Sequence, residues 1–127
     1  MNFDYTVTTK KSFDEAVKMV EQETTTAGFR VLHIHDLATT LHEKGFEIEP
    51  CKIIEICNAK SAYTVLQLDM NIGLCLPCKI NVYVKAGKTY ISGMRPTVLS
   101  EFFPNAKLGN LPTEIDTIIR SIIDKSK

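Results

Sequence analysis

The last segment of the chain carries the pattern that most restricts the fold. Ile115, Ile118, Ile119 and Ile122 recur at spacings that place apolar side chains on one face of a helix. Pro112 suits the first turn of such a helix, where its missing N–H group costs nothing. An isoleucine face of this kind must be buried against another element. The pattern therefore predicts a helix packed on a second structural layer.

That second layer is predicted to be a β-sheet of about five strands. Apolar and polar residues alternate from Phe3 to Thr9, as in a strand with one buried face. Four more strands are expected at Phe29 to His35, Cys51 to Cys57, Lys79 to Lys85 and Lys88 to Met94. The last two form a hairpin around Ala86 and Gly87. Further helices are expected at Phe13 to Ala27, Leu37 to Lys44 and Ala59 to Leu68, with a loop from Gly73 to Pro77. The fold class is α+β, with a mixed or antiparallel sheet and helices packed on one face.

Length and charge restrict the class of partner. The chain has 127 residues and no linker that would divide it, so residues 1–127 are predicted to form a single domain. Fifteen Lys and Arg residues balance fifteen Asp and Glu residues. Because general nucleic-acid binders and polybasic membrane proteins need an excess of positive charge, neither partner is expected.

The start of the chain and the four cysteines suggest a compartment. Met1 to Tyr5 is neither basic nor followed by an apolar run, and no stretch is long enough to span a membrane. We therefore expect a cytoplasmic protein whose cysteines remain thiols or form transient redox pairs. No glycine-rich phosphate loop or Ser-His-Asp arrangement is present, and no cofactor is expected.

Two central motifs resemble a known family. Residues 54–63 read IEICNAKSAY, and residues 68–80 read LDMNIGLCLPCKI. In order and spacing they are similar to signatures of the domain of unknown function 302 family. Gly28-Phe29 before an aliphatic strand and the SGMRP segment at residues 92–96 fit as well. The resemblance covers the chain from about Phe3 to Pro96.

The resemblance implies more about structure than about activity. It implies a TATA-box-binding-protein-like architecture and pairing as a homodimer. The function of the family is unsettled, although some members are associated with sulfur metabolism. Cys78 matches the family cysteine, whereas Cys75 stands where leucine is usual and Met70 where proline is common. A role for Cys75 therefore does not follow from the resemblance.

Cys57, Asn58 and Cys78 are the candidate ligand-binding residues. Cys57 ends a predicted strand, and Asn58 is a favourable N-cap for the following helix. The unpaired amides at a helix start stabilise a thiolate and can also bind an anion. We hypothesise that Cys57 and Cys78 converge at one end of the sheet. The simpler interpretation is that Cys57 is a small buried apolar residue.

The cysteines also allow redox and metal interpretations. Cys75 and Cys78 form a Cys-x-x-Cys motif, so Cys57, Cys75 and Cys78 are the redox candidates. However, this motif precedes a strand rather than opening a helix, which weakens the analogy with thioredoxin. A four-cysteine zinc site would need the isolated Cys51 together with Cys57. We expect no metal.

The histidines offer a second metal alternative. Strict alternation along residues 29–35 places Val31 and His33 on the same face, opposite Ile34. His33 and His35 share that face, so they can chelate zinc or copper, with His42 from the next helix as a third ligand. The simpler interpretation, which we favour, is three partly exposed histidines near a sheet edge.

Three functions follow from these features. The leading hypothesis is a homodimer that binds a small ligand near Cys57, Asn58 and Cys78, with little or no catalysis. The second is a thiol-based sulfur or redox enzyme that uses Cys57 and Cys78. The third is a structural or interaction module without a pocket. A pocket bordered by Cys57 favours the first two hypotheses over the third.

Overall fold

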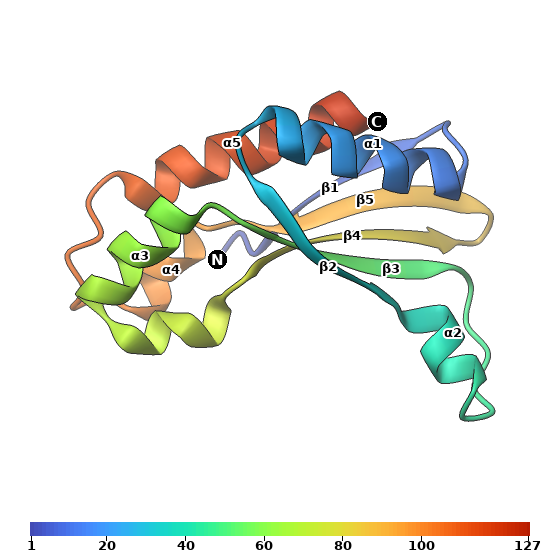
Figure 1. The fold of residues 1–127 in the computed structure, drawn as a ribbon, viewed down its shortest axis with the longest axis horizontal. Helices are drawn as coiled ribbons and strands as arrows, with labels where there is room; N and C mark the ends of the chain where they lie inside the picture. The colour runs from blue at the N-terminus through green and yellow to red at the C-terminus, as the bar shows by residue number, and fades with distance from the viewer.

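A computed structural model describes residues 1–127 as a five-stranded sheet with helices (Figure 1). The sheet order is β1-β5-β4-β3-β2, and every neighbouring pair is antiparallel. The strands are β1 (Asp4–Thr9), β2 (Arg30–Asp36), β3 (Cys51–Cys57), β4 (Cys78–Lys85) and β5 (Lys88–Met94). The predicted α+β class and number of strands are confirmed. The sheet is antiparallel rather than mixed.

Two long helices cover one face of the sheet. Helices α1 (Phe13–Thr26) and α5 (Leu111–Ser126) lie side by side above the strands (Figure 1). The main core joins these helices to the strands, and its fully buried side chains include Val20, Ile54, Ile56, Ile80, Val82, Ile91, Ile122 and Ile123. The isoleucine face of α5 is rotated from the predicted one. Ile118 is 36% exposed, whereas Ile123 is 0% exposed.

The remaining helices lie at the two ends of the sheet. Helices α3 (Ala59–Leu68), η1 (Met70–Cys75) and α4 (Val98–Phe102) gather at one end (Figure 1). The predicted 73–77 loop is therefore partly helical. A second core forms at this end from Val65, Ile72, Leu99 and Leu108. Helix α2 (Leu37–His42) projects from the other end, and none of its residues is buried.

Local capping explains where the helices start. Ser12 Oγ accepts a hydrogen bond from the Glu15 amide at the start of α1. Asp36 Oδ1 accepts from the Thr39 amide at the start of α2. Gly28 follows the end of α1 with a φ of +83°, a conformation that favours glycine. These short-range signals set the helix boundaries.

Strand β2 departs from strict alternation. Its register with β3 shifts between Val31 and His33, which leaves Leu32 as a bulge residue. Val31 and Ile34 therefore both pack against the main core. His33 pairs with Glu55 on the other face. The predicted grouping of Val31 with His33 is wrong, because the sequence does not reveal the extra residue.

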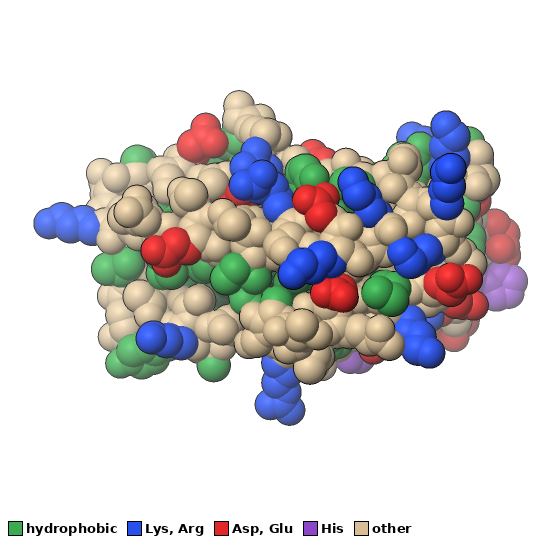
Figure 2. Space-filling view, turned by 90° about the horizontal axis from the view of Figure 1, so that it is seen from above, with side chains coloured by type: hydrophobic (Ala, Val, Ile, Leu, Met, Phe, Trp, Pro, Cys, Tyr) green, Lys and Arg blue, Asp and Glu red, His purple; other side chains and the backbone are tan.

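The surface carries both signs of charge. Seen from the side of α1 and α5, Lys and Arg side chains are interspersed with Asp and Glu side chains (Figure 2). No helix is long and apolar enough to span a lipid bilayer. No basic stripe of the kind used to bind nucleic acid runs over this face.

Candidate functional site

A small cavity lies where the end of β3 meets α3, α4 and the start of α5. Its volume is about 30 Å³, and the residues that line it include Cys57, Asn58 and Cys78. The other lining residues are Phe29, Ile56, Ser61, Ala62, Val65, Leu76, Pro96, Leu99 and Ile115. Nine of the twelve are hydrophobic and none is charged. A void of this size accommodates a water-sized group.

The antiparallel pairing of β3 and β4 brings the two cysteines to this cavity. Cys78 is the first residue of β4 and pairs with Ile56 of β3. Cys57 follows Ile56 as the last residue of β3, so it lies next to this pair. The chain then turns from Cys57 through Asn58 into α3. The three residues predicted as a site from separate motifs thus border one cavity.

Asn58 is fixed by two hydrogen bonds. Its Oδ1 accepts from the Ser61 amide at 3.0 Å, which caps α3. Its Nδ2 donates to the Gly28 carbonyl at 3.4 Å. One of the first-turn amides of α3 is therefore already paired within the chain. The carboxamide ties α3 to the turn before β2 and holds that wall of the cavity in place.

Burial makes the Cys78 thiol a neutral group. The pKa of Cys78 is raised to about 11, mainly by desolvation. The nearby Cys57 contributes to this rise, and Cys75 contributes less. At neutral pH Cys78 is therefore protonated and presents a soft, weakly polar surface. Of the two thiols at the cavity, Cys78 is unsuited to attack an electrophile, because the thiolate is the nucleophilic form.

The other two cysteines are not among the residues that line the cavity. Cys75 ends η1 and packs against the second core. Cys51 begins β3, at the opposite end of that seven-residue strand from Cys57. All four cysteines are free. The four-cysteine zinc alternative is wrong, because strand geometry separates Cys51 and Cys57 by roughly 20 Å.

The histidines do not converge on a metal. His33 and His35 touch edge to face with ring centroids 4.4 Å apart, and His35 Nε2 lies 2.9 Å from Glu55 Oε2. His42 instead pairs with Glu47 beside the projecting helix α2. No group of three or more His, Cys, Asp or Glu side chains is arranged to hold a metal ion. The three-histidine alternative is therefore wrong.

Comparison with known proteins gives the family. The model of the family described as "Domain of unknown function DUF302" matches residues 5–126. The chain belongs to this family. A solved structure with the same domain, titled as an uncharacterized conserved protein DUF302 from Bacillus stearothermophilus, is similar with a TM-score of 0.93 and 30% identity over 100% of both chains. No curated protein matched the chain. The resemblance seen in the central motifs is confirmed.

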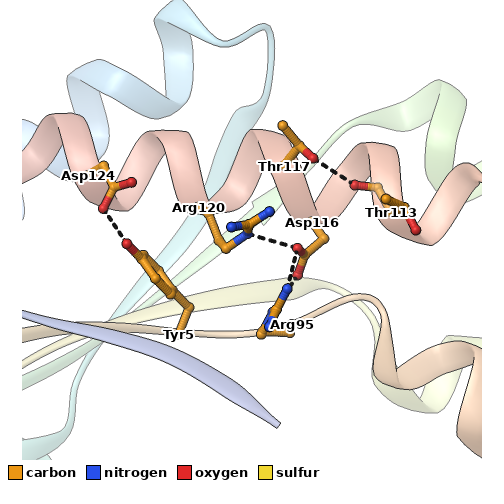
Figure 3. A network of polar contacts seen from close by, with 7 residues as sticks. All are labelled: Tyr5, Arg95, Thr113, Asp116, Thr117, Arg120 and Asp124. Atoms are coloured by element: carbon orange, nitrogen blue, oxygen red, sulfur yellow. Dashed lines mark hydrogen bonds and ion pairs between the residues drawn. The ribbon is translucent and has the colours of Figure 1, made fainter. Parts of the chain in front are cut away.

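The DUF302 domain also contains a buried ion-pair network that the sequence analysis missed. The Asp116 carboxylate on α5 accepts hydrogen bonds from Nε and Nη2 of Arg95, each at 3.0 Å, and from Nε of Arg120 at 2.9 Å (Figure 3). The Asp116 side chain is 2% exposed. Burial raises its pKa, but the two arginines outweigh burial and the net shift is downward. The i,i+4 spacing of Asp116 and Arg120 was the available sequence signal.

This network adjoins the cavity. Arg95 immediately precedes Pro96, and Asp116 immediately follows Ile115. Pro96 and Ile115 both line the cavity. The Arg95–Asp116 pair therefore fixes the chain after β5 against α5, next to these two wall residues. Neither Arg95 nor Asp116 lines the cavity, so the ion pair acts by holding the neighbouring wall residues in position.

A second polar contact holds β1 under α5. The Tyr5 hydroxyl donates to Asp124 Oδ1 at 2.6 Å (Figure 3). The hydrogen bond to Asp124 raises the pKa of Tyr5, with burial as the next cause. Arg120 lies over the Tyr5 ring at 6.0 Å from its centroid. These contacts attach the edge strand to the helix that covers it.

Proposed function

We propose that the protein binds a small neutral ligand in the cavity bordered by Cys57, Asn58 and Cys78. The observation that carries this proposal is the cavity itself, which is lined by two cysteines, the fixed Asn58 and Ser61 among otherwise apolar residues. We further propose that residues 1–127 act as a single cytoplasmic domain and as a homodimer, as the family resemblance implies.

The walls determine which ligands are favoured. A charged ligand would lose its hydration without gaining an opposite charge, because no charged side chain lines the cavity. The Ser61 amide at the start of α3 already donates its hydrogen bond to Asn58 Oδ1, so it is not available to bind an anionic ligand. A compact neutral group that contacts sulfur and aliphatic carbon suits these walls best. At about 30 Å³ the cavity is far smaller than pockets for drug-sized molecules, at roughly 300 Å³ or more.

Native mass spectrometry of protein purified from its source tests this function. The expected result is a retained neutral species, with Cys57 and Cys78 unmodified. Ala62→Leu fills the cavity and should abolish retention. Ala59→Leu is the matched control, because Ala59 lies on the same helix but is exposed and does not line the cavity. Equal retention by both variants would contradict the proposed site.

The second candidate is a thiol-based sulfur or redox enzyme that uses the same two cysteines. It is favoured by the placement of Cys57 beside Cys78, because Cys78 pairs with Ile56, the residue before Cys57. In this case Cys57 would attack and Cys78 would be the partner. The two functions differ in the rate at which iodoacetamide alkylates Cys57 at pH 7. A ligand-binding protein should react no faster than an unfolded control, whereas an enzyme of this kind should react much faster.

A further inference from the structure

The free edge of β1 offers unpaired backbone groups in a regular row. The Arg95 amide donates to the Phe3 carbonyl, so Phe3 and Arg95 form a hydrogen-bonded pair. In an antiparallel ladder such pairs alternate with pairs that are not hydrogen-bonded. The N–H and C=O groups of Asp4, Thr6 and Thr8 therefore point away from β5. No strand lies on that side, because β1 is the first strand of the sheet.

This edge lacks several of the features that normally prevent strand pairing. Strand β1 runs for six residues with the sequence DYTVTT and contains no proline, glycine or lysine. Its register with β5 has no shift. The opposite edge differs, because β2 is interrupted by the bulge at Leu32. Regular, uninterrupted edge strands readily pair with another chain.

We propose that β1 pairs antiparallel with β1 of a second copy of the chain, with Thr6 on the two-fold axis. This inference rests on the homodimer of the proposed function and specifies its interface. Thr6 exchanges two backbone hydrogen bonds with the partner's Thr6. Asp4 exchanges two with the partner's Thr8, and Thr8 exchanges two with the partner's Asp4. All outward backbone groups of β1 are then satisfied, and the two sheets become continuous.

The side chains are self-complementary in this register. Tyr5 lies opposite the partner's Val7, an aromatic and β-branched pair of the kind that stabilises sheets. Asp4 lies opposite the partner's Thr8 and diagonal to the partner's Lys10, within reach of that long side chain. The Lys10 side chain is exposed to solvent. The dyad therefore creates two Asp4–Lys10 ion pairs.

Neighbouring registers are less favourable. A dyad at Asp4 would place Asp4 opposite the partner's Asp4, and directly opposed like charges destabilise a sheet. A dyad at Thr8 would leave Asp4 opposite the partner's Ser12, which is the N-cap of α1 and lies outside the strand. Only the register centred on Thr6 uses all three outward residues of β1.

Sedimentation velocity and amide hydrogen exchange of the full chain together test this interface. A six-residue strand pair is small for a protein interface, so we expect a dimer that dissociates on dilution. The amides of Asp4, Thr6 and Thr8 should be protected at high concentration and exchange freely on dilution. The amides of Tyr5 and Val7, which pair with β5, should be protected at both concentrations.

Charge reversal adds a matched test. Asp4→Lys and Lys10→Asp should each weaken dimerisation about tenfold. Each change places two side chains of the same charge next to each other at both symmetry-related positions of the interface. The double variant restores the opposite charges and should recover wild-type dimerisation. Asp14→Lys makes the same change of charge at an exposed site on α1 and should have no effect.

The outcomes separate this inference from the proposed function. A dimer whose Asp4, Thr6 and Thr8 amides exchange freely would overturn the β1 interface and leave the homodimer intact. A chain that stays monomeric at all concentrations would overturn both the interface and the homodimer. Neither result bears on the cavity, whose lining residues do not belong to β1.

Discussion

Gly93 of β5 lies directly beneath Ile123 of α5, and a Cβ atom at position 93 would be 3.0 Å from Ile123 Cδ1. The same Cβ atom would be 3.3 Å from Ile119 Cγ2. These distances are shorter than ordinary contacts between carbon atoms. The missing side chain of Gly93 therefore allows α5 to approach β5 closely, and this approach sets the position of the helix that carries Ile115 to the cavity.

We predict that Gly93→Ala lowers the free energy of unfolding by about 1–3 kcal/mol, because the added methyl group overpacks the core. Combining it with Ile123→Val should recover part of the loss by removing the atom in contact. Gly73→Ala is the control, because its nearest neighbour would be Leu66 Cδ2 at an ordinary 3.5 Å. Urea unfolding measures all three variants. A Gly93→Ala protein as stable as the wild type would contradict this account of how α5 packs.

Asp116→Asn should destabilise the protein by about 3 kcal/mol, because it leaves two arginines facing a neutral amide in a buried position. Arg95 and Arg120 lose their only carboxylate partner. Asp14→Asn, at an exposed position in the first turn of α1, should cost less than 1 kcal/mol. Chemical denaturation provides the comparison. Equal stability of the two variants would show that the network does not hold α5 to the chain after β5.

The same carboxylate gives a pH dependence whose sign follows from its lowered pKa. The unfolded chain takes up a proton at Asp116 near pH 3.9, before the folded chain does. The stabilisation is therefore complete above about pH 5 and is lost as pH falls from 3.9 through the folded pKa. The difference in unfolding free energy between wild type and Asp116→Asn should be constant from pH 5 to pH 7 and shrink below pH 4. A difference independent of pH down to pH 2 would argue against the lowered pKa.

Cys78 should react slowly with alkylating reagents in the folded protein. Its pKa of about 11 lies two units above the ordinary thiol value of 9.0. At neutral pH its thiolate fraction is therefore about 100-fold smaller than that of an ordinary cysteine. Mass spectrometry after timed iodoacetamide labelling reports each cysteine separately, and the urea-unfolded protein provides the reference rate. Labelling of folded Cys78 at the unfolded rate would mean that the thiol is neither buried nor neutral.

The parts of this structure that depend on nearby residues could be predicted from the sequence. The bounds of β3 and β5 and the caps at Ser12 and Asn58 follow from local alternation and hydrogen-bonding chemistry. The rotation of α5 could not be predicted, because Ile118 and Ile123 both fit an apolar helical face. The close approach over Gly93 decides between them. The bulge at Leu32 could not be predicted either, because one extra residue in a strand gives no recognisable sequence pattern.

The sequence predicted that the candidate site residues lie close together, but it did not predict the apolar character of the cavity they line. The motifs singled out Cys57, Asn58 and Cys78, and the pairing of β3 with β4 brings them around one cavity. The walls contributed by Pro96 and Ile115 come from distant parts of the chain. Burial within the folded chain raises the pKa of Cys78, and this burial is not visible in the motif itself. Long-range packing of this kind cannot be read from single motifs.

The most direct test of the central claim is amide NMR of the protein under xenon pressure, because xenon is a compact, neutral and polarisable probe. We predict shifts of the amides around the cavity, at Ala62, Leu99 and Ile115, that saturate with pressure. These shifts should be absent in Ala62→Leu and unchanged in Ala59→Leu. If the wild-type cavity amides do not respond, or if they respond equally in Ala62→Leu, the cavity does not accept a small neutral guest and the proposed function is contradicted.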